Sequence, residues 1–291
     1  MKRATLEKNT NMANDIMYYI YVHIDTAINL DELAKMFSIN KFYMHKIFKE
    51  VFGRNIYESI QSIRLQKAST LLLTNHYSTI SQISLLCGYA SHISFIRAFK
   101  KRYAMSPKVW RKGGYKEYSQ ELLLSSPYAS RSTASFEDIS PDIVKMPEMS
   151  AYYIRHRGYE KKIRLTWQKI QTWLFSHHID SYTMISLYHD NPALTALGEC
   201  QHVACLVPKE RLLEKNTKLP QLTISQGVYA KFDIEGEDGD ILRFIHWVYL
   251  EWLPNSGYET TIRPPYTIYR KHHHLSDDKR FEVSFYLPIS F

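Results

Sequence analysis

The sequence predicts a multidomain protein, in which an all-α double helix-turn-helix domain precedes an α+β antiparallel domain of two strand-helix-strand-strand repeats. Three observations lead to this prediction. The chain has 291 residues, which is more than one typical domain. Its N-terminal part shows helical periodicity, whereas its C-terminal part has the pattern of strands, and each part contains an internal repeat. We expect domains at 1–112 and 141–291, joined by a linker at 113–140.

Positive charge is concentrated in the N-terminal part. Residues 1–118 contain 18 Lys and Arg against 8 Asp and Glu, whereas the remaining residues contain 19 against 21. This asymmetry indicates a polyanion partner for one domain only. The three cysteines form no CxxC motif, and the sequence has neither a signal peptide nor an apolar run long enough to cross a bilayer. We therefore expect a cytoplasmic protein without a membrane partner.

Helix signals define the N-terminal elements in order. Residues 1–13 are expected to form an irregular lead-in before an amphipathic helix at 14–25. Most of the later helices follow an Asn, Ser or Thr, whose side chain can accept backbone N–H groups. Gly53 is placed to end one of these helices. The expected later helices cover 30–37, 40–52, 55–74, a segment that opens at Thr79, 91–103 and 107–110.

Two of the helix pairs are copies of each other, offset by about fifty residues. Residues 83–100 can be laid over residues 33–49, so that Lys100 overlies Lys49. Each copy is a short helix, a tight turn and a second helix. Gly88 stands at the second turn, where a positive φ is often needed, whereas Ser38 stands at the first.

The second helix of each copy has two distinct faces. In 91–103, Phe95, Ala98 and Phe99 share an ordinary core face at helical spacing. The opposite face combines β-branched apolar residues with cations. This mixture suits a DNA major groove, where cations meet guanine acceptors and phosphates, and methyl groups meet thymine methyls. The outer faces consist of Phe42, His45, Lys46 and Lys49 in the first copy and of Ile93, Ile96, Arg97 and Lys100 in the second.

The C-terminal part repeats a strand-helix-strand-strand unit at an offset of about eighty residues. Two such units would form an antiparallel α+β domain with a pseudo-twofold axis, and facing aromatic residues would line a groove between them. The matched segments are Ser150–Gly158 with Gly227–Gly236, Trp173-Leu174 with Trp252-Leu253, Ile185–His189 with Thr267–Lys271, and Ala204–Pro208 with Ser284–Pro288.

These motifs resemble two known families. The segments LAKMFSINKFYMHKIFKEVFG and ISLLCGYASHISFIRAFKKRYAMSPKVWR resemble the paired helix-turn-helix domain of AraC/XylS transcription regulators, over about residues 12–112. The segments RHRG, YHDNP, EWLPNSGYE and FYLPI resemble a GyrI-like effector-binding domain. The order of the two domains is that of Rob-like regulators. The resemblance implies a sequence-specific DNA-binding regulator of the activator type, with double-stranded DNA and RNA polymerase as partners.

The resemblance places the base-reading positions on the outer faces described above. The cations could instead form an ordinary solvated surface. The two isoleucines could instead pack against a neighbouring helix. The two histidines are either donors to bases or phosphates, or surface imidazoles. The positions are Asn40, Phe42, His45, Lys46 and Lys49 in the first helix, and His92, Ile93, Ile96, Arg97 and Lys100 in the second.

The C-terminal domain is expected to bind a small amphipathic or aromatic effector. Thr267 occupies the place where GyrI-like domains usually carry a glutamate that faces cationic ligands, so a preference for cations does not carry over. Trp173 and Trp252 are repeat-equivalent and are expected in the core. The expected effector-binding residues are Tyr152, Trp167, Tyr188, Trp247, Thr267 and Tyr269.

The sequence indicates no cofactor, metal or catalytic constellation. Ser, His and Asp occur at no spacing typical of a hydrolase elbow or a phosphate-binding loop. Adjacent side chains on a strand point to opposite faces, so we expect no metal site at His272–His274. Asp190, Glu199 and Glu282 are the C-terminal carboxylates most worth testing. We therefore do not expect an enzyme. The alternatives to a DNA-binding regulator are a small-molecule-binding or sequestering module, or a GyrI-like hydrolase, and in either of these DNA binding would be secondary.

Overall fold

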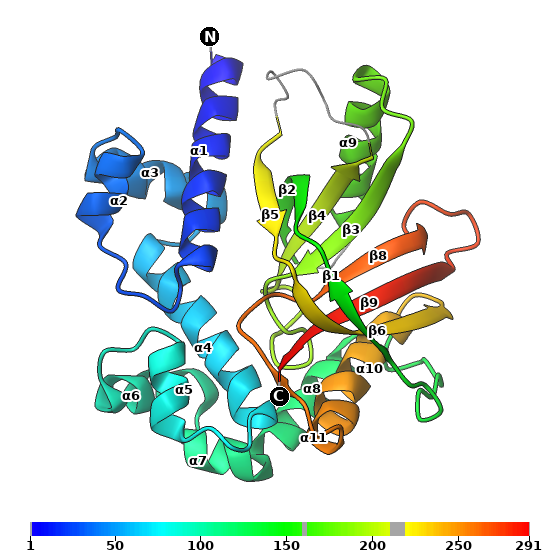
Figure 1. Ribbon diagram of the computed structural model, residues 1–291. Helices are drawn as coiled ribbons and strands as arrows, with labels where there is room; N and C mark the ends of the chain where they lie inside the picture. Colours follow the sequence, from blue (N-terminus) through cyan, green and yellow to red (C-terminus); the bar gives the residue numbers. More distant parts are fainter. Residues whose placement is uncertain (1, 159–161, 210–218, 291) are drawn as a thin grey trace.

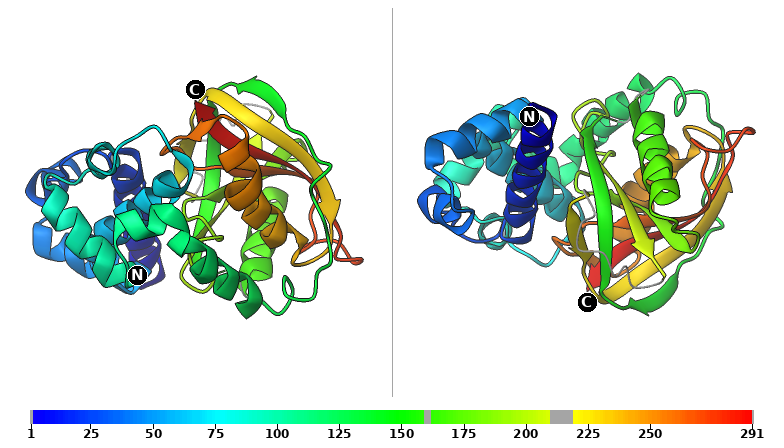
Figure 2. Two further views of the ribbon diagram at one scale, coloured as in Figure 1. Left: turned by 90° about the horizontal axis from the view of Figure 1, so that it is seen from below. Right: turned by 90° about the horizontal axis from the view of Figure 1, so that it is seen from above.

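The computed structural model describes residues 2–158, 162–209 and 219–290. A helical N-terminal half is followed by a C-terminal half built on one antiparallel sheet, and the two halves lie side by side (Figures 1 and 2). This arrangement confirms the predicted fold class. None of the helices in these ranges is both long and apolar enough to cross a membrane.

Five helices of the N-terminal half begin after a capping side chain that the sequence supplies. In each case the side-chain oxygen accepts a backbone N–H of the first turn, which would otherwise be unpaired. The caps are Asn29, Asn40, Asn55, Thr79 and Ser91. The helices are α1 (Lys2–Val22), α2 (Leu30–Met36), α3 (Lys41–Phe52), α4 (Ile56–Thr74), α5 (Ile80–Leu86), α6 (His92–Tyr103) and α7 (Pro107–Val109).

Helix α1 begins at Lys2, so the predicted irregular lead-in is wrong for residues 2–13; residue 1 lies outside the described residues. A tertiary contact explains the additional turns. The Tyr43 hydroxyl of α3 donates to the Asn9 side chain at 2.7 Å, and α1 packs along α3. The first turns of α1 are therefore stabilised by a neighbour that is distant in the sequence.

The two tight turns of the helix pairs have the same backbone conformation. Gly88 has a φ of 76°, and Ser38 at the equivalent turn has a φ of 54°. Glycine is required at the second turn for a further reason, because a Cβ there would overlap the carbonyl oxygen of Ile24. The first turn tolerates serine in the left-handed conformation, which explains why its sequence signal is weaker.

Part of the segment that the sequence assigns to a linker is helical. Residues Trp110–Gly114 (η1) lead directly into α8 (Tyr115–Ser125), and α8 packs against α10 (Asp240–Trp247) of the C-terminal half. The Ser119 hydroxyl, which is fully buried, donates to the carbonyl oxygen of Ala193 at 2.6 Å. This segment therefore attaches to the C-terminal half.

The sheet of the C-terminal half has the order β1-β6-β9-β8-β3-β4-β2-β5, with β7 paired to β9. Its helices α9 and α10 cover one face. The strands are β1 (Asp142–Met146), β2 (Met149–Arg157), β3 (Tyr182–Tyr188), β4 (Gln201–Pro208), β5 (Gln221–Ile224), β6 (Gly227–Gly236), β7 (Glu259–Thr260), β8 (Tyr266–Lys271) and β9 (Phe281–Ser290); the helices are α9 (Lys162–Ser176), α10, η2 (Val248–Trp252) and α11 (Leu253–Asn255).

The strand order confirms the predicted repeat. One unit is β2-α9-β3-β4 and the other is β6-α10-β8-β9, and the second strand pairs of the units meet at the centre, where β3 pairs with β8. The outer strands are exchanged: β1 precedes β2 but pairs with β6, and β5 precedes β6 but pairs with β2. Because each unit completes the edge of the other, the two units fold as one sheet.

One hydrophobic core runs through both halves of the protein. It contains Leu72 of α4 and Phe99 of α6 together with Phe244 of α10 and Phe285 of β9. Polar contacts reinforce the junction, such as the bond from the Asn75 side chain to the carbonyl oxygen of Thr260 at 3.1 Å. The helical half is therefore packed on the sheet half through α4, the helix that joins its two helix-turn-helix units.

Candidate nucleic-acid interface and ligand cavity

The two helix-turn-helix units flank opposite ends of α4. Helices α3 and α6 both lie on the side of the molecule away from the sheet (Figure 1). Their inner faces pack as the periodicity predicts, since Met44, Ile47, Phe95 and Phe99 are fully buried. The outer faces are left for a partner.

Most of the predicted base-reading residues are exposed on these outer faces. Phe42 is 89% exposed and Ile93 is 71% exposed, which excludes intramolecular packing for either side chain. Single exposed apolar side chains are common on protein surfaces, so these two are informative only because they lie beside cations on the same helix faces. The other exposed members of the set are Asn40, Lys46, Lys49, His92, Arg97 and Lys100.

Two members of the set are only half-exposed. Ile96 packs partly against the shared core. Part of its side chain is therefore used for packing within the protein, which is the alternative that the sequence left open. His45 lies against Tyr57 of α4, with ring centroids 6.2 Å apart. Tyr57 is 60% exposed and lies in the groove along α4 between the two units. Tyr57 is absent from the predicted base-reading set, because the repeat places that set on the second helix of each unit and Tyr57 lies on α4.

Two cations near the outer faces are paired with carboxylates. Lys41 pairs with Asp31 at 3.0 Å, and Arg102 pairs with Glu199 at 2.7 Å. Within the described ranges, no salt bridge involves the cations of the outer faces, which are Lys46, Lys49, Arg97 and Lys100. Their charge is therefore available to phosphates and base acceptors.

A cavity of about 90 Å³ lies in the C-terminal half, where the two repeats meet. Tyr188 of β3, His202 of β4 and Tyr269 of β8 point to the face of the sheet that α9 and α10 cover, and they form its floor. Ile163 of α9 and Ile245 of α10 form opposite walls. The cavity therefore lies near the pseudo-twofold axis, between the two helices.

The structure distributes the expected effector-binding residues unevenly around this cavity. Tyr188 and Tyr269 line it. Thr267 is fully buried and donates to the Tyr188 hydroxyl at 3.1 Å, so it orients a lining residue. Trp167 is also fully buried and packs edge-on against Tyr269 at 5.7 Å.

The other two expected residues lie elsewhere. Tyr152 packs against Trp173 of α9, with ring centroids 5.3 Å apart. Trp247 packs against Phe232 and Phe244 in the shared core. Neither lines the cavity. The sequence could not exclude these two residues from the cavity, because spacing alone does not show how the helices are placed on the sheet.

The cavity lining is largely uncharged at neutral pH. Burial lowers the pKa of His202 well below its usual value, and it lowers the pKa of His273 to about 4 and that of His274 to about 3. Burial raises the pKa of Tyr188 to about 12. The one carboxylate among the lining residues is Asp238, at the end of the loop before α10.

The three adjacent histidines lie in the turn after β8 and not on a strand. The argument that their side chains must point to opposite faces is therefore wrong. His273 and His274 lie beside each other, with ring centroids 3.9 Å apart, and Asp238 approaches His273 at 3.8 Å. The sequence contained no signal for this group, because Asp238 lies in the loop after β6, which is distant along the chain from the turn after β8.

The three singled-out carboxylates have different environments. Asp190 is buried and accepts the backbone N–H of Gln201 at 2.5 Å, and burial raises its pKa to about 6. Glu199 pairs with Arg102 of α6, which holds the pKa of the carboxyl below its usual value. Glu282 is exposed on β9. Two of the three carboxylates therefore lie at or near the junction of the two halves.

Comparison with known families matches both halves of the chain. Residues 140–290 match the family described as GyrI-like small molecule binding domain. Residues 33–113 match the family described as helix-turn-helix domain. The first match covers just over half of the chain, and it contains the whole cavity lining except two residues that follow α8.

Two individual relatives each match about a third of the chain. The Xylose operon regulatory protein of Escherichia coli (strain K12) is 37% identical over 95 residues, which are 33% of this chain and 24% of that protein. The Transposon Tn10 TetD protein of Escherichia coli is 31% identical over 105 residues, which are 36% of this chain and 75% of that protein. The chain thus spans only about a quarter of the length of the first of these relatives.

One solved structure similar to part of this chain is the EcmrR C-terminal domain, with 14% identity and a TM-score of 0.41, over 53% of this chain and 98% of that one.

Proposed function

Because this chain belongs to the AraC-type regulators that carry a GyrI-like small molecule binding domain, we propose that it is a sequence-specific DNA-binding transcription regulator controlled through its C-terminal domain. The observation that carries the proposal is the pair of exposed helix faces on α3 and α6. Each combines unpaired cations with exposed apolar side chains, and both lie away from the sheet.

On DNA, α3 and α6 would enter successive major grooves, whose centres are about 34 Å apart on one side of the duplex. Arg97 is suited to guanine acceptors, and Ile93 is suited to thymine methyl groups. Lys46, Lys49 and Lys100 would contact phosphates or base edges near the same grooves. An activator role, and a contact with RNA polymerase, follow from the family resemblance alone.

The direct experiment is selection of DNA fragments by the purified full chain at physiological salt. We expect a small set of fragments to be enriched and to share one sequence that spans two adjacent major grooves. Specific binding should exceed binding to random DNA by at least about 10³-fold. Equal binding to all fragments would overturn the proposal and favour a small-molecule-binding module whose contact with DNA is secondary.

For the C-terminal half we propose a small, neutral, aromatic or amphipathic effector. Thr267 is engaged with Tyr188, and the cavity floor consists of neutral rings, so an organic cation would find a single carboxylate, Asp238, among the lining residues. The cavity of about 90 Å³ is smaller than the ~300–1,000 Å³ of typical ligand sites. An effector therefore has to widen it by moving the surrounding loops.

One of these loops connects the cavity to the DNA-binding half. The β3–β4 loop lines the cavity with Pro192 and Leu197. Its Asn191 side chain donates to Thr70 of α4 at 3.3 Å, and its Glu199 pairs with Arg102 of α6. Widening the cavity would displace this loop and with it the helix that carries Arg97. This connection supports coupling between effector and DNA binding.

The effector proposal can be tested by a thermal-shift screen on the full chain with paired neutral and cationic aromatic compounds. We expect the neutral members to raise the melting temperature and Tyr269→Leu to abolish their effect. Tyr77→Leu, at a residue that is 90% exposed on the N-terminal half, should leave the effect unchanged. Binding that survives Tyr269→Leu would place the effector outside this cavity.

A further inference from the structure

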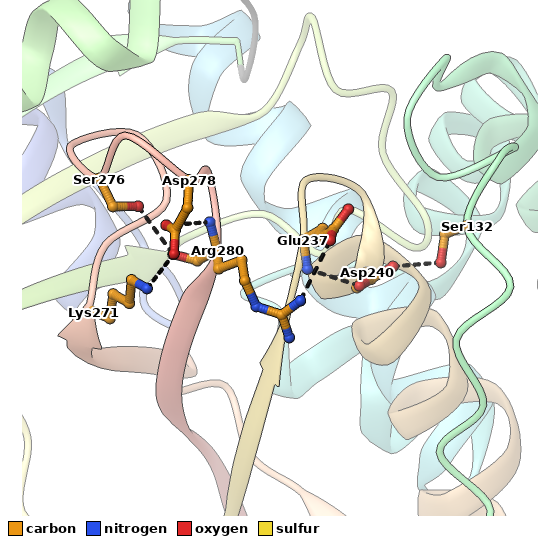
Figure 3. Close-up of polar contacts among 7 residues, drawn as sticks. All are labelled: Ser132, Glu237, Asp240, Lys271, Ser276, Asp278 and Arg280. Atoms are coloured by element: carbon orange, nitrogen blue, oxygen red, sulfur yellow. Dashed lines mark hydrogen bonds and ion pairs between the residues drawn. The ribbon is translucent and has the colours of Figure 1, made fainter.

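Two loops from different parts of the sheet domain meet beside the cavity. The turn after β8 contains His273 and His274, and the loop after β6 contains Asp238. Figure 3 shows polar contacts within and between these loops. Arg280 pairs with Glu237 at 3.4 Å and thereby bridges the base of one loop to the other.

Each loop is also braced internally. In the turn after β8, the Lys271 ammonium pairs with Asp278 at 2.5 Å, and Asp278 accepts the backbone N–H of Arg280 at 3.1 Å (Figure 3). In the loop after β6, the Asp240 carboxylate accepts the backbone N–H of Glu237 at 2.8 Å. These bonds fix the backbone on both sides of the histidines and Asp238, so their side chains are held near each other before any ligand arrives.

The three side chains form a compact donor set. One potential ligand atom of each of Asp238, His273 and His274 lies within 4.8 Å of those of the other two. The His273 Nε2 atom is 3.8 Å from an Asp238 carboxylate oxygen. Ligand atoms on a tetrahedral zinc ion, bound at about 2.0–2.1 Å, are roughly 3.3 Å apart. Small rotations of the side chains would therefore close the set around one ion.

The environment of His273 lacks the hydrogen bonds that a structural histidine usually makes. His273 is only 7% exposed, yet its Nδ1 atom is buried with no hydrogen-bond partner among the described residues. Because Nδ1 makes no hydrogen bond within the part of the chain that the structure describes, nothing there fixes which ring nitrogen of His273 faces Asp238, and the imidazole can turn to present either nitrogen to an ion. The neighbouring His272 accepts the backbone N–H of His274 through Nδ1 at 3.3 Å, which shapes the turn.

From this geometry we propose that Asp238, His273 and His274 bind a divalent transition-metal ion of the zinc class at the edge of the cavity. Two imidazole nitrogens and one carboxylate oxygen are a donor set that suits zinc and similar ions, whereas magnesium and calcium prefer oxygen donors.

Three protein ligands leave at least one coordination position open, as in sites that bind a water or an exchangeable ligand. All three residues line the cavity, so the open position would face its interior. The metal site goes beyond the proposed regulator function, because it would exist whether or not the effector contacts the ion.

The test is titration of the untagged, metal-free full chain with Co²⁺, followed by competition with Zn²⁺. We expect one equivalent per chain, visible absorption bands of low-symmetry Co²⁺, and loss of these bands when Zn²⁺ is added. Asp238→Asn and His274→Gln should each weaken binding by at least about tenfold. Circular dichroism of each variant checks that it remains folded.

Matched controls are Asp277→Asn, an exposed carboxylate in the same turn, and His178→Asn, an exposed histidine after α9. Both should bind the ion as the unmodified chain does. The proposal is overturned if no saturable binding occurs at micromolar metal. It is equally overturned if folded Asp238→Asn and His274→Gln proteins bind Co²⁺ with unchanged affinity and spectrum, because the ion would then lie at other histidines.

Discussion

Arg97 and Lys49 stand on the outer faces of α6 and α3, but their side chains have different capacities. The planar guanidinium of Arg97 can donate two parallel hydrogen bonds to guanine, whereas the ammonium of Lys49 acts as a point charge. Both residues are exposed, and neither belongs to a salt bridge in the described part of the chain. This difference predicts two distinguishable phenotypes.

For Arg97→Ala we expect a loss of about 1–3 kcal/mol in binding to the selected DNA sequence and relaxed preference at one base position. The measurement is a set of affinities for all four bases at each position. Lys116→Ala, on the exposed side of α8, is the control for loss of charge. Equal losses on selected and random DNA would show that Arg97 does not read bases.

For Lys49→Ala we expect weaker binding to all sequences alike and a less steep dependence of log K on log salt. The slope should fall in magnitude by about 0.9, because one phosphate contact is lost. Affinities at several salt concentrations measure this slope. An unchanged slope would mean that Lys49 remains solvated when DNA is bound.

Asp190 gives a prediction on stability. Burial raises its pKa from 3.8 to about 6, so the folded state holds its proton more tightly than the unfolded state. The resulting stabilisation is complete below about pH 3 and is lost as the pH rises through 6. In Asp190→Asn this loss should disappear, because the amide oxygen can still accept the N–H of Gln201.

The free energy of unfolding should fall by about 3 kcal/mol more in the unmodified protein than in Asp190→Asn as the pH rises from 3 to 8. Urea unfolding at several pH values measures it. Parallel curves for the two proteins would show that the carboxyl titrates normally in the folded state.

At the scale of elements, the ends of α3 and α6 are equivalent in conformation but not in sequence. Gly53 at the end of α3 has a φ of 71°, and Ala104 at the end of α6 has a φ of 57°. No atom lies within 4 Å of a Cβ built on Gly53, so only the backbone conformation opposes a side chain there. The left-handed conformation costs a non-glycine residue about 1–2 kcal/mol.

We therefore expect Gly53→Ala to lower the free energy of unfolding by about 1 kcal/mol and Ala104→Gly to raise it by about 0.5–1 kcal/mol. Thermal or urea unfolding of both variants measures the effects, and each serves as the control for the other. Changes of the same sign would contradict this explanation of the helix ends.

The sequence predicted these elements well because their signals are local. The caps Asn29, Asn40, Thr79 and Ser91, and the core face of α6, depend on spacings within one or two turns. Helix α1 was mispredicted at its start because its first turns depend on a contact with α3. Tyr57 and Asp238 were missed for the same reason, since their neighbours come from other elements.

At the scale of the whole molecule, the shared core predicts that the two halves unfold together. Leu72 of α4 is fully buried in that core, and Leu72→Ala should cost about 2–5 kcal/mol. Four of the five tryptophans lie beyond residue 141, so their fluorescence reports mainly on the C-terminal half. We expect the fluorescence transition and the far-UV circular dichroism transition to coincide and to shift together in this variant.

Lys116→Ala again provides a control. The free energy of unfolding from either signal should change by no more than about 0.5 kcal/mol in this variant. A shift confined to the circular dichroism signal would show that the N-terminal half unfolds independently, and coupling through α4 would then have to be discarded.

By itself, the sequence determined the two repeats, the order of the domains and the composition of the outer helix faces, because each of these depends on residues at short or regular spacings. Only the tertiary structure decided that β1 and β5 exchange between the units, that α4 packs on the sheet, and that Asp238 meets His273 and His274. These features join residues that are distant along the chain, and their pairing depends on how packed surfaces match in three dimensions, which no local pattern of side chains specifies.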